Sequence, residues 1–126
     1  MEPILSDLLG SARQSYPQEC CGLLLGGDGV ITQARPARNV HPTPQTHFEI
    51  DPRALIDAHR EERQGGLEVI GYYHSHPTGD TVPSARDAAQ AAGDGRIWAI
   101  VARNAVRFWK STSNGFRELS IPIIKS

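Results

Sequence analysis

Two histidines separated by one residue, His74 and His76, follow an apolar run at residues 67–73. The run predicts a buried strand, and side chains two residues apart in a strand point to the same face. We therefore expect the two imidazoles to project together from a rigid edge. Such a pair is a common part of a metal site, although an isolated His-x-His also occurs at ordinary strand ends. A metal site here requires a third ligand from elsewhere in the chain.

Asp87 is the candidate for that third ligand. It stands three residues after Ser84, which is the spacing of a helix capping pair, and capping alone accounts for the pattern. A helix N-terminus also holds a carboxylate in one orientation, so the two roles are compatible. Asp80, in the preceding loop, is the alternative ligand if Asp87 is only a cap. Two imidazoles and one carboxylate form an open, hydrolytic Zn²⁺ site.

A hydrolytic metal site also needs an acid/base group, and Glu19 is the candidate. It precedes the apolar residues 20–25, where a buried carboxylate without a partner is costly. An exposed glutamate in a turn after Pro17 explains the sequence equally well. In the functional interpretation, Glu19 passes a proton from water to the leaving amine. The Ser84 hydroxyl then donates a hydrogen bond to the developing oxyanion.

Cys20 and Cys21 are the two cysteines of the chain, and they are adjacent. Neighbouring cysteines rarely pair with each other because the disulfide is strained. We expect two reduced, buried thiols, with a catalytic thiol as the alternative. Their side chains face opposite ways on a strand, so they do not close a structural zinc site with four protein ligands.

The remaining pattern predicts alternating helices and strands. Helices are expected over residues 3–15, 52–64 and 84–92, and strands over residues 20–25, 30–37, 47–50, 67–73, 96–102, 105–111 and 116–121. This order predicts a mixed sheet flanked by helices, of the α/β or α+β class. With 126 residues, we expect one domain that spans residues 1–126.

Composition narrows the range of partners. The net charge is −1 and no Lys/Arg run stands out, which argues against a nucleic-acid partner. No apolar stretch reaches membrane-spanning length and no signal peptide is evident, so we expect no membrane partner and a cytoplasmic location. The sequence does not indicate an oligomeric state.

The candidate residues together resemble a known motif. Glu19, the segment His74-Ser75-His76-Pro77, and then Ser84 and Asp87 resemble the JAMM motif of the MPN+ (Mov34/MPN/PAD-1) metalloprotease family in residue type, order and spacing. Residues 17–26 and 48–52 resemble the short prokaryotic members, and the likeness extends from about residue 5 to residue 109. The resemblance implies a cytidine-deaminase-like fold with one Zn²⁺ per chain. It assigns the ligands to His74, His76 and Asp87, the acid/base role to Glu19 and the oxyanion donor to Ser84.

The same resemblance implies a zinc peptidase or isopeptidase that cleaves after the C-terminal Gly-Gly of a ubiquitin-like protein. Short bacterial relatives release an amino acid such as cysteine from the C-terminus of a sulfur-carrier protein, and we expect this substrate class, with the carrier's tail laid along a strand edge. The alternatives are a deubiquitinase-like isopeptidase and a non-catalytic scaffold that binds ubiquitin-like proteins. A zinc deaminase is not favoured, because the chain lacks the Pro-Cys-x-x-Cys segment.

Overall fold

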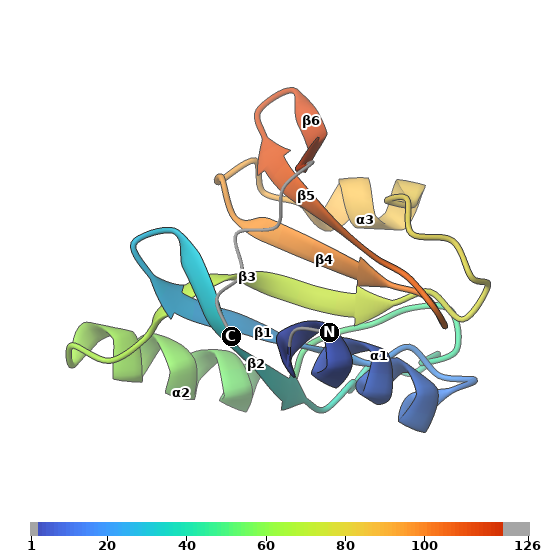
Figure 1. Cartoon of the computed structure of the whole chain (residues 1–126), viewed down its shortest axis with the longest axis horizontal. Helices are drawn as coiled ribbons and strands as arrows, with labels where there is room; N and C mark the ends of the chain where they lie inside the picture. The colour runs from blue at the N-terminus through green and yellow to red at the C-terminus, as the bar shows by residue number, and fades with distance from the viewer. Residues whose placement is uncertain (1–2, 120–126) are drawn as a thin grey trace.

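The structure, a computed structural model, describes residues 3–119, and a mixed six-stranded sheet forms its centre (Figure 1). The strands are β1 (Cys21–Gly27), β2 (Val30–Ala37), β3 (Glu68–Ser75), β4 (Ile97–Val101), β5 (Val106–Thr112) and β6 (Gly115–Leu119). Their order in the sheet is β2-β1-β3-β4-β5-β6. β3 and β4 run parallel, whereas the other neighbours run antiparallel. The predicted mixed sheet is confirmed.

Helices cover both faces of this sheet. Helix α1 (Pro3–Ser15) packs on one face, and α2 (Pro52–Arg63) and α3 (Ala85–Gln90) lie over the other (Figure 1). Side chains alternate along β1, so Leu24 enters the core beneath α1 while Leu23 and Leu25 enter the core on the opposite face. Among residues 3–119, no helix combines the length and apolar composition of a membrane span.

β3 runs through the middle of the sheet and carries the first histidine. It continues to Ser75 instead of ending at residue 73, because its parallel pairing with β4 persists through His74–Ile100 and Ser75–Val101. His74 consequently lies within the strand and is fully buried. The helix predicted over residues 84–92 is shorter, Ala85–Gln90, and it begins after Ser84.

The strand predicted over residues 47–50 was wrong. Within this segment, Ile50 forms an isolated bridge with Asn39 and no strand is present. The Asn39 side chain accepts a hydrogen bond from the Glu49 N–H and donates one to the His47 carbonyl. A side chain thus satisfies backbone groups that a neighbouring strand would otherwise pair. Of the last predicted strand, residues 120 and 121 lie outside the described residues.

Candidate metal centre

The three predicted ligands meet where β3 ends and α3 begins. His74 Nε2 lies 3.1 Å from His76 Nε2 and 3.0 Å from Asp87 Oδ1, and Asp87 Oδ2 lies 3.1 Å from His76 Nε2. All three side chains are buried. One ligand atom from each residue lies within 4.8 Å of the others, so the three side chains could hold a metal ion together.

The donor set fits a small divalent metal. Ligand atoms at about 2.0–2.1 Å from a tetrahedral Zn²⁺ lie roughly 3.3 Å apart, close to the separations found here. His76 Nδ1 faces the backbone carbonyl of Asp80 at 2.9 Å. This partner assigns the ring proton to Nδ1 and leaves the lone pair of Nε2 directed at the other two ligands. Two nitrogens and one oxygen, without a thiolate, suit an open zinc site.

Asp87 acts as a cap and a member of the cluster at the same time. Ser84 N–H donates to Asp87 Oδ2 at 2.9 Å, and Asp87 N–H donates to Ser84 Oγ at 3.1 Å, which completes a capping box. Burial alone would raise the pKa of Asp87. The hydrogen bonds to His74 and His76 outweigh burial and hold that pKa well below its usual range. The capping interpretation and the metal-site interpretation of the Ser-x-x-Asp spacing are therefore compatible, because Asp87 makes both sets of contacts.

The two histidine rings are held by different means. His74 stacks on Phe48 with ring centroids 4.2 Å apart and meets the edge of Trp98 at 5.7 Å. Its Nδ1 is buried and has no hydrogen-bond partner among residues 3–119, so packing sets the orientation of this ring. Burial lowers the pKa of His74. Burial also disfavours the charged form of His76, but the hydrogen bond to Asp87 outweighs it and raises the pKa of His76.

Asp80 is not part of the cluster. Its side chain accepts a hydrogen bond from the Val82 N–H at 2.8 Å, within its own loop. Its contribution to the site is the backbone carbonyl that faces His76 Nδ1. The alternative in which Asp80 replaces Asp87 as a ligand is therefore not supported.

Glu19 is buried, with 7% of its surface exposed, which decides against the exposed turn residue. Burial, together with the charge of Asp87, raises its pKa to about 7 against the opposing charges of His76 and Arg86. Among residues 3–119 its carboxylate accepts no hydrogen bond, whereas its backbone N–H and carbonyl each form one. Glu19 N–H donates to the Pro44 carbonyl at 2.7 Å, and its carbonyl accepts from Asn39 Nδ2 at 3.0 Å.

Asn39 supports the backbone of Glu19 through contacts that the sequence did not reveal. Its Nδ2 donates to the carbonyls of Glu19 and His47, each at 3.0 Å, and its Oδ1 accepts from the N–H groups of His41 and Glu49, each at 3.1 Å. One amide thus joins the residue before β1 to both ends of the loop over residues 39–50. An amide side chain at the end of a strand, before a polar loop, is the one sequence signal of this role.

The cysteines have no catalytic surroundings. Both thiols are free and buried, and burial raises their pKa, that of Cys21 to about 12. Such thiols stay protonated, so the structure does not favour a thiolate nucleophile. Cys20 N–H donates to the Ser75 hydroxyl at 2.8 Å on the α1 side of the sheet. Ser75 therefore links the segment before β1 to the histidine strand and points away from the His74–His76–Asp87 cluster.

Comparisons with known proteins identify the family. The sequence model of the family described as "Prokaryotic homologs of the JAB domain" matches residues 1–112. The desampylase of Haloferax volcanii is 34% identical over 97% of this chain and 90% of that protein. The probable TtuB-protein conjugate cleaving protease of Thermus thermophilus is 41% identical over 70% of this chain and 59% of its own length. The CysO-cysteine peptidase of Mycobacterium tuberculosis is 22% identical over 97% of this chain and 88% of that protein.

Solved structures agree with this assignment. The solution structure of a protein from Desulfitobacterium hafniense matches with a TM-score of 0.84 and 29% identity, over 100% of this chain and 91% of that one. A structure described as a JAMM metalloprotease-like zinc site in the proteasome and signalosome matches with a TM-score of 0.56 and 18% identity, over 99% of this chain and 94% of that one, which shows the fold. The family match and the 34% identical relative confirm the resemblance: the chain belongs to the prokaryotic homologs of the JAB domain and is a JAMM-type metallopeptidase.

Proposed function

We propose that this enzyme is a Zn²⁺-dependent peptidase or isopeptidase that hydrolyses the amide bond after the C-terminal Gly-Gly of a ubiquitin-like protein. The observation that carries the proposal is the convergence of His74, His76 and Asp87 beside a buried Glu19 whose pKa is about 7. The names of the relatives, a desampylase, a TtuB-protein conjugate cleaving protease and a CysO-cysteine peptidase, support cleavage of bonds formed by small ubiquitin-like proteins.

In the proposed mechanism, His74, His76 and Asp87 hold the metal. The chemistry that a bound Zn²⁺ would supply there is Lewis-acid polarisation of the scissile carbonyl and activation of the attacking water. Glu19 accepts the proton of that water and returns it to the departing amine, and a pKa near 7 suits both directions of transfer at neutral pH. The Ser84 oxygen already accepts the Asp87 N–H, so its hydroxyl proton is available to the developing oxyanion.

Two forms of substrate are compatible with this chemistry. In one, a sulfur-carrier protein bears an additional C-terminal amino acid such as cysteine, and the name of the 22% identical relative supports it. In the other, the carrier is joined to another protein, and the names of the 34% and 41% identical relatives support that form. We place the activity in one domain of residues 1–126. The cytoplasmic location remains a prediction.

Metal content and hydrolysis test the proposal together. We expect the purified protein to bind about one Zn²⁺ per chain and to cleave a ubiquitin-like protein extended past its Gly-Gly. A chelator abolishes cleavage. Glu19→Gln lowers kcat by roughly 10²- to 10⁴-fold and leaves the zinc content unchanged, whereas Glu61→Gln, at an exposed glutamate paired with Arg35, changes neither. Normal cleavage by metal-free protein or by Glu19→Gln would overturn the mechanism.

A further inference from the structure

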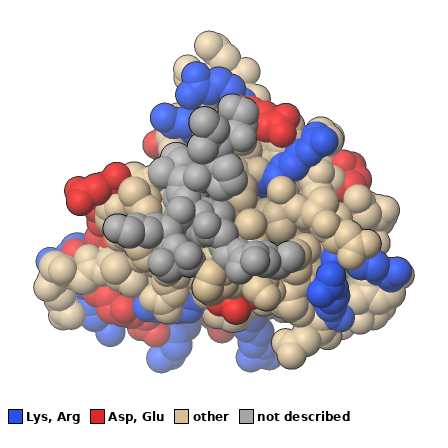
Figure 2. All heavy atoms as spheres, in the orientation of Figure 1, with Lys and Arg blue, Asp and Glu red and all other residues tan. Residues whose placement is uncertain are grey.

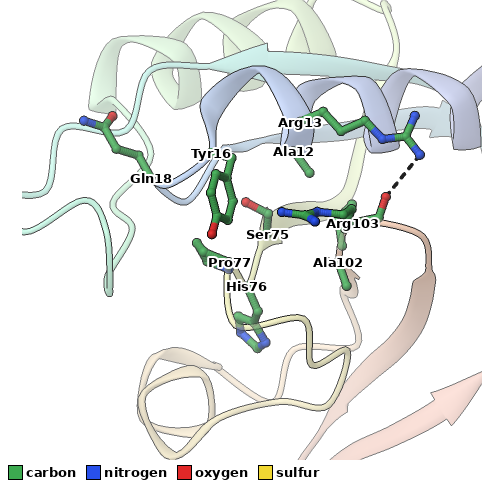
Figure 3. Close-up of a pocket in the computed structure, with 10 residues that line it drawn as sticks. Ala12, Arg13, Tyr16, Gln18, Ser75, His76, Pro77, Ala102 and Arg103 are labelled. Carbon is green, nitrogen blue, oxygen red and sulfur yellow. Dashed lines mark hydrogen bonds between the residues drawn. The ribbon is translucent and has the colours of Figure 1, made fainter.

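A pocket of about 150 Å³ lies beside the metal centre on the α1 side of the sheet (Figure 3). Its walls come from the C-terminal ends of α1, β3 and β4 and from the residues that follow each of them. His76 lines this pocket while its Nε2 faces Asp87. The pocket and the ligand cluster thus share His76, so the extended chain of a substrate bound at the metal needs only a short length to reach the pocket.

The charge of this pocket is positive. Arg13 and Arg103 both line it, and none of the acidic side chains described in the structure does. Among residues 3–119, neither arginine has a carboxylate within 4.0 Å. Figure 2 shows Lys and Arg side chains gathered at the same end of the molecule, where α1 ends and β4 turns into β5. The pocket therefore has positive charge that the described part of the chain does not neutralise.

The Arg103 guanidinium stacks on a ring, and its N–H groups donate no hydrogen bond within the described part of the chain. Its Cζ lies 5.3 Å from the centroid of the Tyr16 ring, and Figure 3 shows the side chain reaching into the pocket. Arg13 donates to the Arg103 carbonyl at 3.2 Å and to Asn104 Oδ1 at 3.4 Å, which fixes the turn after β4. Stacking on a ring leaves the in-plane N–H groups of a guanidinium available, and these match a carboxylate bidentately.

We propose that this pocket binds the C-terminal carboxylate of the leaving part of the substrate, with Arg103 as its main contact and Arg13 at its rim. The inference rests on the proposed function. The opposite side of the cluster supports this direction, because Phe48 and Trp98 pack on His74 and line an apolar groove there. In this arrangement the carrier protein occupies the apolar groove, and the C-terminal carboxylate of the leaving segment occupies the pocket beside His76.

The consequence is a preference between the two substrate forms. A free amino acid or short peptide released from a carrier ends in a carboxylate close to the scissile bond. A lysine side chain in a protein conjugate presents no such carboxylate at that distance. The pocket therefore favours carriers extended by a few residues over protein conjugates.

Matched substrates test this inference. We would extend a ubiquitin-like protein past its Gly-Gly by one alanine or by three, each with a free C-terminal carboxylate or a C-terminal amide. The zinc-loaded enzyme is expected to prefer the carboxylate by about tenfold in kcat/KM at one or both lengths, mainly through KM. Arg103→Gln removes this preference and Arg13→Gln weakens it. Arg53→Gln, at an exposed arginine of α2, leaves it unchanged.

The outcomes separate this inference from the proposed function. Equal cleavage of carboxylate and amide at both lengths, or an undiminished preference in Arg103→Gln, overturns the pocket assignment and leaves the hydrolase intact. Faster cleavage of a lysine-linked conjugate than of every free-carboxylate substrate also overturns it. If the zinc-loaded wild type cleaves none of these substrates, the proposed function fails and the pocket assignment fails with it.

Discussion

Two buried carboxylates near the metal centre have opposite surroundings. Asp87 lies in the first turn of α3, where the Ser84 N–H and both histidine rings contact its oxygens, and these contacts hold its pKa well below the usual range. Glu19 lies just before β1, where burial raises its pKa to about 7 and its carboxylate accepts no hydrogen bond from residues 3–119. Burial acts on both groups, so the difference arises from the hydrogen bonds that only one of them receives.

This contrast supports the two chemical roles that we propose. A carboxylate that stays ionised at every working pH suits a metal ligand, whereas one that titrates near neutrality suits an acid/base. The supports also differ, because Asp87 is held through its side chain and Glu19 through its backbone. Variants that exchange, remove or loosen these supports should therefore have separable effects on zinc content, kcat and stability.

Removing the ionised carboxylate should have the largest effect. Asp87→Ala deletes one of the three proposed ligands and half of the capping box, so we expect loss of both zinc and hydrolysis. Asp87→Asn keeps an oxygen that accepts the Ser84 N–H, but a neutral amide is a poor zinc ligand. It should lose the metal while the metal-free protein stays about 1 kcal/mol more stable than Asp87→Ala.

Zinc content by mass spectrometry and urea unfolding of the metal-free variants measure the two effects separately. Asp57→Ala, at an exposed aspartate of α2, is the control and should change neither. If Asp87→Asn held one zinc and hydrolysed at the wild-type rate, the ligand role of Asp87 would be refuted.

Ser84 has two roles in the proposed mechanism. It caps α3 and exchanges hydrogen bonds with Asp87, and its hydroxyl donates to the oxyanion. Ser84→Ala should cost about 1 kcal/mol of stability as a lost cap. As a lost oxyanion donor it should also lower kcat by roughly 10²- to 10³-fold. Ser84→Thr keeps the hydroxyl and should retain most of both. A Ser84→Ala enzyme with near-normal kcat and reduced stability would leave Ser84 as a cap alone.

The convergence of His74, His76 and Asp87 was predictable because its sequence signals are local. A His-x-His at the end of an apolar strand and a Ser-x-x-Asp cap each report on a few consecutive residues. Folding then only had to bring the end of β3 to the start of α3. The fold class was predictable for a related reason, since periodicity and turn residues mark most elements.

The support of Glu19 could not be predicted, because its contacts join residues distant in sequence. Asn39 meets Glu19 and His47 only after β1, β2 and the following loop have folded. The carbonyl of Asp80 that orients His76 is a backbone atom, so its residue type carries no signal. The strand wrongly predicted over residues 47–50 has the same origin, because a distant side chain replaced the expected strand partner.

The raised pKa of Glu19 predicts a pH-dependent stability difference. Its pKa of about 7 in the folded chain exceeds the ordinary 4.5, so folding favours the protonated form. The stability this provides is complete below pH 4.5 and is lost as pH rises through about 7. The side chain in Glu19→Gln is neutral at every pH, so this variant does not lose that stability as the pH rises. The metal-free variant should therefore be more stable than wild type by about 3 kcal/mol at pH 8 and equally stable at pH 4.5.

Urea unfolding with chelator present, at several pH values, gives this difference directly. His74, His76 and Asp87 are common to both proteins, so their titration largely cancels. Asn114→Ala, in the turn between β5 and β6, removes no titratable group and should show no pH-dependent difference. A constant difference for Glu19→Gln between pH 4.5 and pH 8 would mean that Glu19 ionises freely, and its assignment as the acid/base would lose its electrostatic basis.

The smallest expected effect comes from loosening Glu19 without changing it. Asn39→Asp keeps the oxygen that accepts from His41 and Glu49, but it replaces the amide donor with an oxygen facing the Glu19 carbonyl. We expect kcat to fall about tenfold or more, with a smaller change in KM and an altered acid limb of the pH profile. Asn114→Ala, in the turn between β5 and β6, should leave all three unchanged.

A loss of folding stability alone would not lower kcat in the Asn39 variants. Assayed at a temperature where circular dichroism shows every variant fully folded, a merely structural Asn39 would yield normal kcat in both Asn39→Asp and Asn39→Ala. A positioning role yields reduced kcat in both, because each lacks the donor to the Glu19 carbonyl. Normal kcat in Asn39→Asp would show that β1 places Glu19 by itself. The backbone support that distinguishes Glu19 from Asp87 would then have no part in the reaction.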